Sequence, residues 1–193
     1  MQDRRIRKTK NLLKNTMIAL LNSMTFEKIT VTDICKKADI SRITFYSHYS
    51  DKYALADEVF DDFCTIAKSH FFRLQKENNP NNDSVQNYCN ILDCILQLFS
   101  TYPAFFQHIT PEQNPYLSSL LYHITLKTVE NQTRMESHNH QLRYTPRQIT
   151  GFLCYGLTGF INESRGEGIE EECIHQQAKQ LLMDTVRSQV IIE

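Results

Sequence analysis

Residues 29–60 read ITVTDICKKADISRITFYSHYSDKYALADEVF, and this stretch decides the fold. Thr30 and Asp33 form a T-x-x-D capping pattern, which predicts a short helix over about 31–38. Ser41 is a good N-cap for a second short helix that follows closely. Two short helices joined by about three residues are typical of a helix-turn-helix, whose second helix enters the major groove of DNA.

The second short helix has two chemically different faces. Phe45 and Tyr49 fall on one face at helical spacing, which predicts that both rings pack inward. Groups that suit base edges occupy the other positions. The guanidinium of Arg42 can donate two hydrogen bonds to a guanine, and the methyl groups of Ile43 and Thr44 can contact a thymine methyl. The pattern therefore predicts a helix that reads DNA.

Helical spacing of apolar residues continues on both sides of this stretch, and no segment alternates as a strand. The sequence predicts an all-α chain of about nine helices, with an N-terminal three-helix helix-turn-helix domain and a larger C-terminal helical bundle. Ser50 is expected to cap a long helix that begins at Asp51. The other helices are expected at about 4–24, 31–38, 41–48, 85–101, 103–108 and 170–190. Two more are expected to begin at Asn114-Pro115 and at Thr145-Pro146. Gly166 and Gly168 are expected to end the second of these two helices.

Charge is distributed unevenly along the 193 residues, although the formal net charge is −1. Residues 1–52 hold 11 Lys and Arg against 5 Asp and Glu, whereas residues 53–193 hold 10 against 17. A basic segment joined to an acidic remainder is typical of a nucleic-acid module attached to a body that does not bind nucleic acid. Charge alone fits a solvated basic face equally well, so the motif has to decide between the two.

The composition also predicts where the protein works. No stretch approaches the ~20 apolar residues of a membrane span, so we expect no membrane partner. The basic amino terminus lacks the apolar core and the small-residue cleavage site of a secretory signal. We therefore expect a cytoplasmic protein whose six cysteines are free thiols.

Residues 29–60 resemble the helix-turn-helix of TetR-type transcriptional regulators, in which the pattern T-v-x-d-I-a-x-x-A-g-v-S-x-x-t-F/L-Y-x-H/Y-F-x-s-K-x-x-L recurs. The match extends over about residues 4–60, and the remainder agrees only in architecture. The resemblance implies a DNA-binding domain over 1–50 and a ligand-binding and dimerisation domain over 51–193. It also implies a homodimeric regulator, more often a repressor than an activator, that a small-molecule effector releases from a palindromic operator.

Carried over by position, the resemblance assigns contacts with bases or phosphates to the second short helix and to the starts of two neighbouring helices. Asp39 replaces the usual glycine of the turn, and aspartate tolerates the left-handed conformation better than most residues. Arg4, Arg5 and Lys8 can add phosphate or minor-groove contacts. The predicted DNA-binding residues are Thr32, Ser41, Arg42, Ile43, Thr44, Tyr46, Ser47, His48 and Lys52.

A second predicted surface lies on the last two helices, where the resemblance implies the dimer interface. Gly151, Gly156 and Gly159 fall inside a predicted helix, where each costs about 1 kcal/mol relative to alanine when exposed. Close approach of another helix explains them, whether that helix comes from the same chain or from a partner. The predicted interface residues are Gly156, Gly159, Phe160, Leu181 and Leu182.

Three alternatives stay open at this point. A zinc site would use His138, His140, Cys173 and His175, but the sequence has no H-E-x-x-H or paired C-x-x-C motif, so we expect no metal, no other cofactor and no enzymatic activity. A thiol switch would act through Cys35, although that position is normally small and buried. The third alternative is a transcriptional activator or co-regulator of the same fold that acts through a protein partner. The sequence does not identify the effector.

Overall fold

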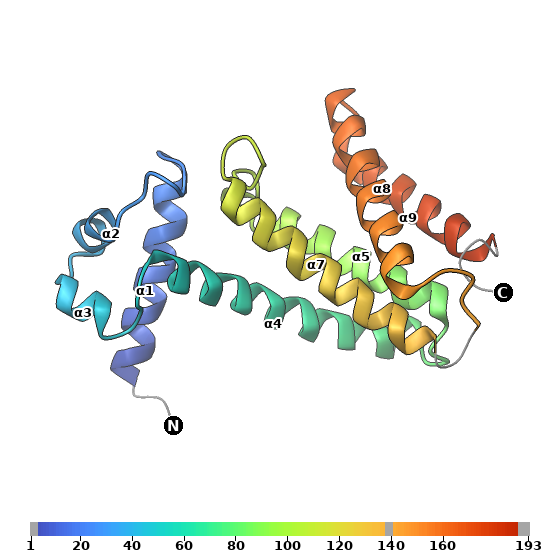
Figure 1. Cartoon of the computed structure of the whole chain (residues 1–193), viewed down its shortest axis with the longest axis horizontal. Helices are drawn as coiled ribbons and strands as arrows, with labels where there is room; N and C mark the ends of the chain where they lie inside the picture. Colours follow the sequence, from blue (N-terminus) through green and yellow to red (C-terminus); the bar gives the residue numbers. More distant parts are fainter. Residues whose placement is uncertain (1–3, 138–140, 189–193) are drawn as a thin grey trace. The chain divides into compact units, whose positions relative to one another are not determined.

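The computed structural model describes residues 4–137 and 141–188, and these ranges contain nine α-helices and no β-strand (Figure 1). The predicted all-α class is therefore confirmed. Most predicted boundaries agree with the structure to within a few residues. The helices are α1 (Arg4–Leu21), α2 (Val31–Ala38), α3 (Arg42–Tyr46), α4 (Lys52–Asn78), α5 (Ser84–Thr101), α6 (Pro103–Phe106), α7 (Pro115–Glu136), α8 (Pro146–Gly166) and α9 (Glu171–Arg187).

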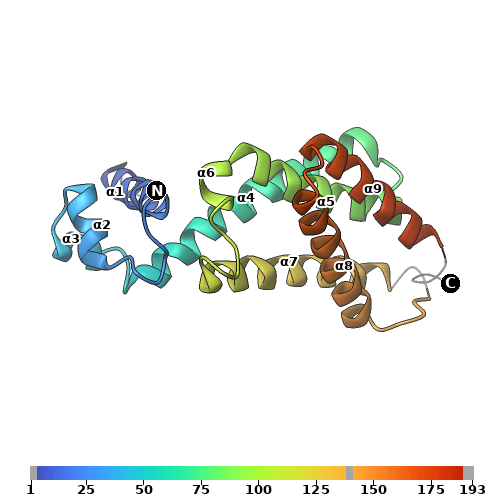
Figure 2. The same cartoon turned by 90° about the horizontal axis from the view of Figure 1, so that it is seen from above.

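The chain forms two compact units, and their limits differ from the predicted domain boundary after residue 50. Unit 1 comprises residues 1–66 and 99–121, and unit 2 comprises residues 67–98 and 122–193. Three helices, α4, α5 and α7, have residues in both units. Figure 2 shows each of them as a continuous helical ribbon. The residues around α6 therefore belong to the same unit as the helix-turn-helix.

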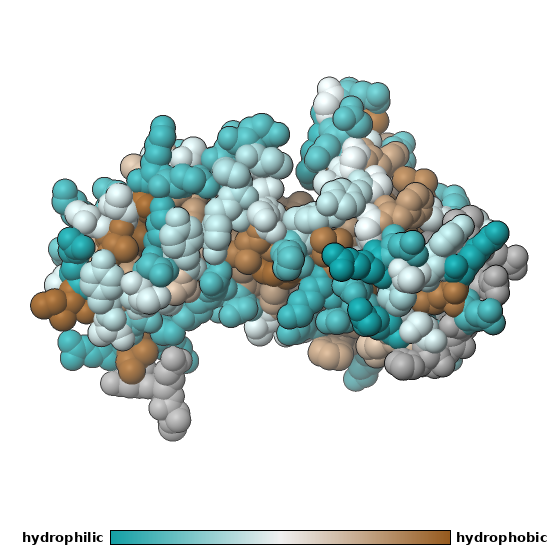
Figure 3. All heavy atoms as spheres, viewed as in Figure 1, coloured by the Kyte–Doolittle hydropathy of each residue, from teal (hydrophilic) through white to brown (hydrophobic). Residues whose placement is uncertain are grey.

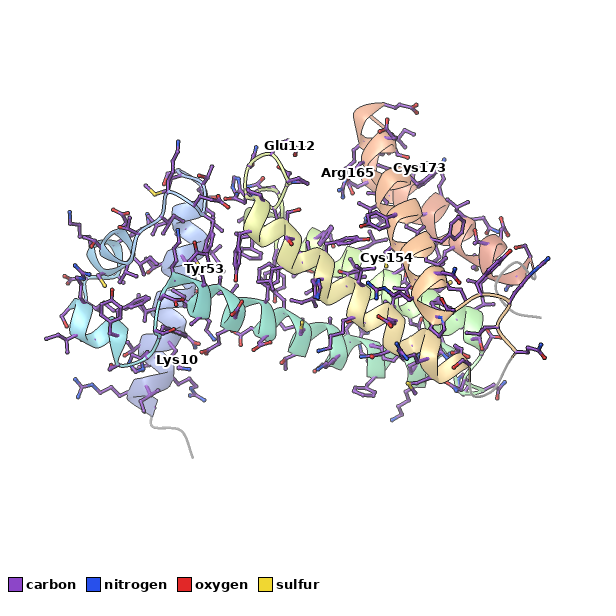
Figure 4. All side chains as sticks on the ribbon, viewed as in Figure 1. Lys10, Tyr53, Glu112, Cys154, Arg165 and Cys173 are labelled. Atoms are coloured by element: carbon purple, nitrogen blue, oxygen red, sulfur yellow. The ribbon has the colours of Figure 1, made fainter. Side chains whose placement is uncertain are left out.

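Unit 1 is held together by an apolar core and by ion pairs between α1 and α4. The side chains of Leu13, Phe45 and Leu55 are fully buried. Lys10 Nζ lies 2.6 Å from a carboxylate oxygen of Glu58, and Lys14 Nζ lies 3.4 Å from the other oxygen of that group. These pairs fix the polar side of α1 on α4, close to the first turns of α4 that carry Tyr53 in Figure 4.

A cluster of aromatic rings extends unit 1 towards α6. The ring of Phe63 lies 5.0 Å from the rings of both Phe105 and Phe106, and Phe60 lies 5.6 Å from Phe105. Edge and tilted contacts of this kind add about 0.5–1.5 kcal/mol per pair beyond the area that they bury. They explain why α6 belongs to unit 1.

Unit 2 packs α5, α7, α8 and α9 around one apolar core. Cys89, Leu153 and Ala178 are among its buried residues, and α8 and α9 lie side by side (Figure 1). A buried polar network closes one end of the unit, where Glu136 accepts hydrogen bonds from Ser84 Oγ and from Asn87 Nδ2. Because the carboxylate has several donors, its burial is compensated.

Local capping follows the sequence at the starts of α2 and α8. Thr30 with Asp33 and Thr145 with Gln148 form the two predicted capping boxes. The predicted cap of α4 is wrong. Asp51, and not Ser50, accepts hydrogen bonds from the backbone N–H groups of Tyr53 and Ala54, each at 2.8 Å, and the helix begins at Lys52. Serine and aspartate are both good caps, so adjacent candidates leave the start of a helix undecided by one residue.

Candidate nucleic-acid interface

The turn between α2 and α3 has the geometry that a helix-turn-helix requires. Asp39 adopts a left-handed conformation with φ 53° and ψ 49°, and its N–H donates to the carbonyls of Cys35 and Lys36 at the end of α2. Aspartate in place of glycine therefore preserves the turn. Phe45 is fully buried, and its ring lies 5.9 Å from that of Tyr49. Both rings point inward as predicted, so the opposite face of α3 is directed to solvent.

The exposed face of α3 combines an apolar side chain with an arginine–tyrosine pair. Ile43 is 83% exposed, and apolar surface over α3 is visible in Figure 3. Arg42 donates from its guanidinium to the hydroxyl of Tyr46 at 3.4 Å and lies 5.8 Å from the centre of that ring. A planar guanidinium held against a ring loses less rotamer freedom when it forms paired hydrogen bonds. The face therefore offers a partly ordered donor next to a methyl-bearing surface.

The hydroxyl groups on α3 are partly engaged within the helix. Ser41 Oγ accepts from the backbone N–H of Thr44 at 3.0 Å, which confirms Ser41 as the N-cap. Ser47 Oγ donates to the carbonyl of Thr44 at 2.7 Å. A hydroxyl oxygen keeps a further acceptor site, and these side chains lie at the surface with His48 half-buried beside them. Thr32 is half-buried in the first turn of α2, where the backbone N–H groups point outward.

Lys52 has a role that differs from the predicted phosphate contact. Its Nζ donates to the carbonyl oxygens of Phe26 at 2.8 Å, Glu27 at 3.0 Å and Ile29 at 2.8 Å. Three acceptors satisfy all three donors of an ammonium group. The same Nζ lies 4.7 Å from the ring centre of Phe26 and 5.4 Å from that of Tyr53. Lys52 therefore fixes the turn between α1 and α2, and it has no donor left for a phosphate.

Pairing also reduces the number of cations that α1 offers to a nucleic acid. Lys10 and Lys14 face Glu58 and Asp62 of α4, and Lys14 Nζ lies 2.5 Å from Asp62. Figure 4 labels Lys10 on α1. Arg4, Arg5 and Lys8, from the first turns of α1, are exposed.

The predicted dimer residues divide into exposed and buried positions. A Cβ added at Gly156 or Gly159 would meet no atom within 4 Å, so no other helix among the described residues explains these glycines. Leu182 is only 3% exposed and belongs to the core of unit 2, which removes it from any interface. Phe160 is half-buried against that core, whereas Leu181 is exposed.

Two further exposed side chains on α8 are not among the predicted interface residues. Phe152 is 62% exposed and Tyr155 is 67% exposed, and apolar surface appears over α8 in Figure 3. Large apolar groups grouped on one helix indicate an interaction surface more strongly than single ones do. The signal was present in the sequence, because both lie within one turn of a helical glycine, but aromatic side chains near glycine are equally common in cores.

The described residues give no support to the metal and thiol alternatives. Within 4–137 and 141–188, no group of three or more His, Cys, Asp or Glu side chains is placed to hold a metal ion, and His138 and His140 lie outside these ranges. Cys35 is buried, and burial raises the pKa of its thiol, so the reactive thiolate is disfavoured. Cys173, labelled on α9 in Figure 4, is exposed. No helix of the described chain is both long and apolar enough to span a membrane.

Comparison with known proteins places this geometry in context. No protein-family model matches the chain. A curated relative, the uncharacterised HTH-type transcriptional regulator YxbF of Bacillus subtilis (strain 168), is 26% identical over 164 residues, which are 80% of this chain. The chain spans 41% of the length of that relative.

Solved structures share the whole architecture. A protein from Syntrophomonas wolfei described as a TetR-family transcriptional regulator superposes with a TM-score of 0.73 at 10% identity, covering 93% of this chain and 95% of its own. The dihydroxyacetone kinase operon activator DhaS superposes with a TM-score of 0.53 at 20% identity, covering 96% and 98%. The chain therefore has the fold that residues 29–60 predicted.

Proposed function

We propose that this chain, whose fold is that of TetR-family regulators, is a sequence-specific DNA-binding transcriptional regulator. The observation that carries the proposal is the outer face of α3. It presents a guanidinium held on Tyr46 beside an isoleucine that is 83% exposed, on a helix whose other face is buried. An arginine pairs with guanine in the major groove, and an apolar side chain contacts a thymine methyl. The proposed contacts are Ser41, Arg42, Ile43, Thr44, Tyr46, Ser47, His48 and Thr32.

We further propose that the protein binds DNA as a homodimer through α8 and α9. The glycines of α8 are uncovered in the single chain, and Phe152 and Tyr155 stand exposed beside them. Closely approaching helices bury such side chains and use glycine to shorten the distance between backbones. The proposed interface therefore contains Gly156, Gly159, Phe160 and Leu181, with Phe152 and Tyr155 added. A two-fold dimer predicts a palindromic operator whose half-sites are separated by whole helical turns.

The regulatory sign and the effector form the finer part of the proposal. We propose a repressor that a small-molecule effector releases from its operator. The described fold is compatible with either sign, because one protein that shares it is named as an operon activator. Placing the selected operator across a promoter upstream of a reporter gene tests this point. A repressor lowers transcription in proportion to operator occupancy, whereas an activator raises it.

Selection of duplexes from a random pool by the purified full chain tests DNA recognition. The expected result is an enriched palindrome, whose binding constant falls steeply with salt because phosphate contacts release counterions. The double variant Arg42→Ala, Tyr46→Ala should lose at least about tenfold in affinity for this palindrome, since each bidentate base contact contributes about 1–3 kcal/mol of discrimination.

A matched control removes the same residue types from the unit that does not contain α3. Arg73 and Tyr144 are exposed and lie in unit 2, so Arg73→Ala, Tyr144→Ala should bind the palindrome as the parent does. If the pool yields no enriched duplex, or if both double variants bind equally, the α3 face does not read DNA and a protein partner becomes the better explanation.

A further inference from the structure

The α1–α2 turn (residues 22–29) leads directly into the N-cap of α2, and side chains from two distant segments hold it. From α4, Lys52 Nζ donates hydrogen bonds to carbonyl oxygens of the turn, as described above. From the segment before α7, Asn114 Oδ1 accepts a hydrogen bond from the backbone N–H of Phe26 at 2.5 Å. The Phe26 side chain is fully buried between them. The turn is therefore fixed at both its N–H and its C=O groups.

Asn114 is built into this contact by both ends of its amide. It is 2% exposed, and its Nδ2 donates to the carbonyl of His108 at 2.6 Å while its Oδ1 holds the Phe26 N–H. Sequence predicts this asparagine as the N-cap of α7, and it does occupy the position before Pro115. Its side chain, however, satisfies a backbone donor that lies 88 positions away in the sequence. The residue therefore connects two segments, where a local cap would connect none.

The neighbouring residues make the contact reciprocal. The N–H of Tyr116, in the first turn of α7, donates to Glu27 Oε1 of the α1–α2 turn at 3.4 Å. The ring of Tyr116 stacks on that of Phe26 at 5.3 Å between centres with a 13° interplanar angle. Each segment thus supplies a group that caps the other, and a stacked ring pair lies between them.

The α6–α7 connection (residues 107–114) also contacts the end of α1. His108 Nε2 lies 3.0 Å from Asn22 Oδ1, and α6 packs against α1. Residues 99–121 belong to unit 1 together with the helix-turn-helix. The α6–α7 connection is therefore a structural part of the unit that contains the helix-turn-helix, although it lies far from α3 in the sequence.

We infer that Asn114 is a positioning residue for DNA recognition, which holds the α1–α2 turn so that α2 and α3 keep the orientation needed to read an operator. The inference rests on the proposed function. Thr30, the N-cap of α2, follows the held turn directly, and α2 sets the direction of α3 through the Asp39 turn. A displacement of the α6–α7 connection therefore weakens specific binding without touching a base-contacting side chain.

The variant Asn114→Ser separates positioning from folding. Serine is as good an N-cap as asparagine, so α7 keeps its start, but the shorter side chain cannot reach both partners and leaves the buried Phe26 N–H without its acceptor. Asn90→Ser is the matched control, because Asn90 is also fully buried and its side-chain amide exchanges two hydrogen bonds with the amide of Asn78 in unit 2. Both variants are measured well below their unfolding midpoints, on the selected palindrome and on a scrambled duplex of the same length.

Asn114→Ser is expected to lower affinity for the palindrome by about tenfold and to change affinity for the scrambled duplex by less than about twofold, because phosphate contacts tolerate a misplaced reading helix better than base contacts do. Hydrogen exchange at the Phe26 amide should accelerate in the absence of DNA. Asn90→Ser should lower the unfolding midpoint and leave the ratio of the two affinities unchanged.

Two results would overturn the inference. In the first, exchange at Phe26 accelerates while the affinity ratio stays at the parental value, which makes Asn114 a residue of stability only. In the second, exchange at Phe26 does not change, which means that the hydrogen bond does not hold the turn. A parent protein that selects no duplex is a different failure: it removes the proposed function and this inference with it, whatever the exchange data show.

Discussion

Replacing Lys52 by methionine is the sharpest test of how unit 1 is built. Methionine keeps an unbranched side chain of similar length but removes the ammonium group that contacts Phe26, Glu27 and Ile29. Hydrogen bonds to a charged group contribute about 1.5–3 kcal/mol when buried. These bonds are part-buried or exposed, so we assign them about 2–3 kcal/mol together. The two cation–π contacts, with Phe26 and Tyr53, add about 0.5–1 kcal/mol.

The expected loss of unfolding free energy for Lys52→Met is thus about 2.5–4 kcal/mol. For a chain of this length, 1 kcal/mol corresponds to about 2–4 °C in the unfolding midpoint, so calorimetry should detect a decrease of about 10 °C. Lys68→Met is the control, because Lys68 is exposed on the same helix. It should shift the midpoint by less than about 2 °C, since surface substitutions stay within about 0.5 kcal/mol.

Salt titration of DNA binding distinguishes the structural role of Lys52 from a phosphate contact. Each neutralised phosphate contributes about 0.9 to the slope of log K against log salt. Because all three ammonium donors are used inside the chain, the slope for the folded Lys52→Met variant should equal that of the parent. An unchanged midpoint together with a shallower slope would refute the reasoning and restore the predicted phosphate contact.

The remaining predictions concern acid stability, thiol chemistry and assembly. Hydrogen bonds from Thr30 lower the pKa of Asp33 in the folded protein below its ordinary value of 3.8. The ionised Asp33 carboxylate therefore stabilises the folded protein above pH 3.8, and this stabilisation is lost as the pH falls through the lower pKa of the folded state. Urea midpoints measured from pH 5 to pH 3 should therefore fall less steeply in Asp33→Asn than in the parent. Iodoacetamide should modify exposed Cys173 in the native protein and leave Cys35 unmodified, as peptide mass spectrometry can establish, and diamide should leave DNA binding unchanged. Tyr155→Glu should convert the proposed dimer to a monomer in sedimentation, whereas an unchanged sedimentation coefficient would place the interface elsewhere.

Sequence predicts those features of this chain that depend on neighbouring residues. A capping box joins positions three apart, so Thr30 with Asp33 could be read directly, and inward-facing Phe45 follows from helical periodicity alone. Lys52 and Asn114 were assigned differently for a physical reason. Their hydrogen bonds reach partners 26 and 88 positions away, and no local pattern reports which backbone groups a fold brings to a side chain.

The same reasoning applies to the charge asymmetry that first suggested a nucleic-acid partner. The basic excess of residues 1–52 includes Lys10 and Lys14, which are paired with carboxylates of α4, and Lys52, which is engaged by carbonyl oxygens. Since the carboxylates of Glu58 and Asp62 lie beyond residue 52, a count by segment overstates the positive field that DNA meets. Electrostatic attraction from the remaining exposed cations is sequence-independent and supplies affinity without discrimination. In the proposed function, recognition of one operator therefore has to come from the α3 face and from the contacts that hold it in place.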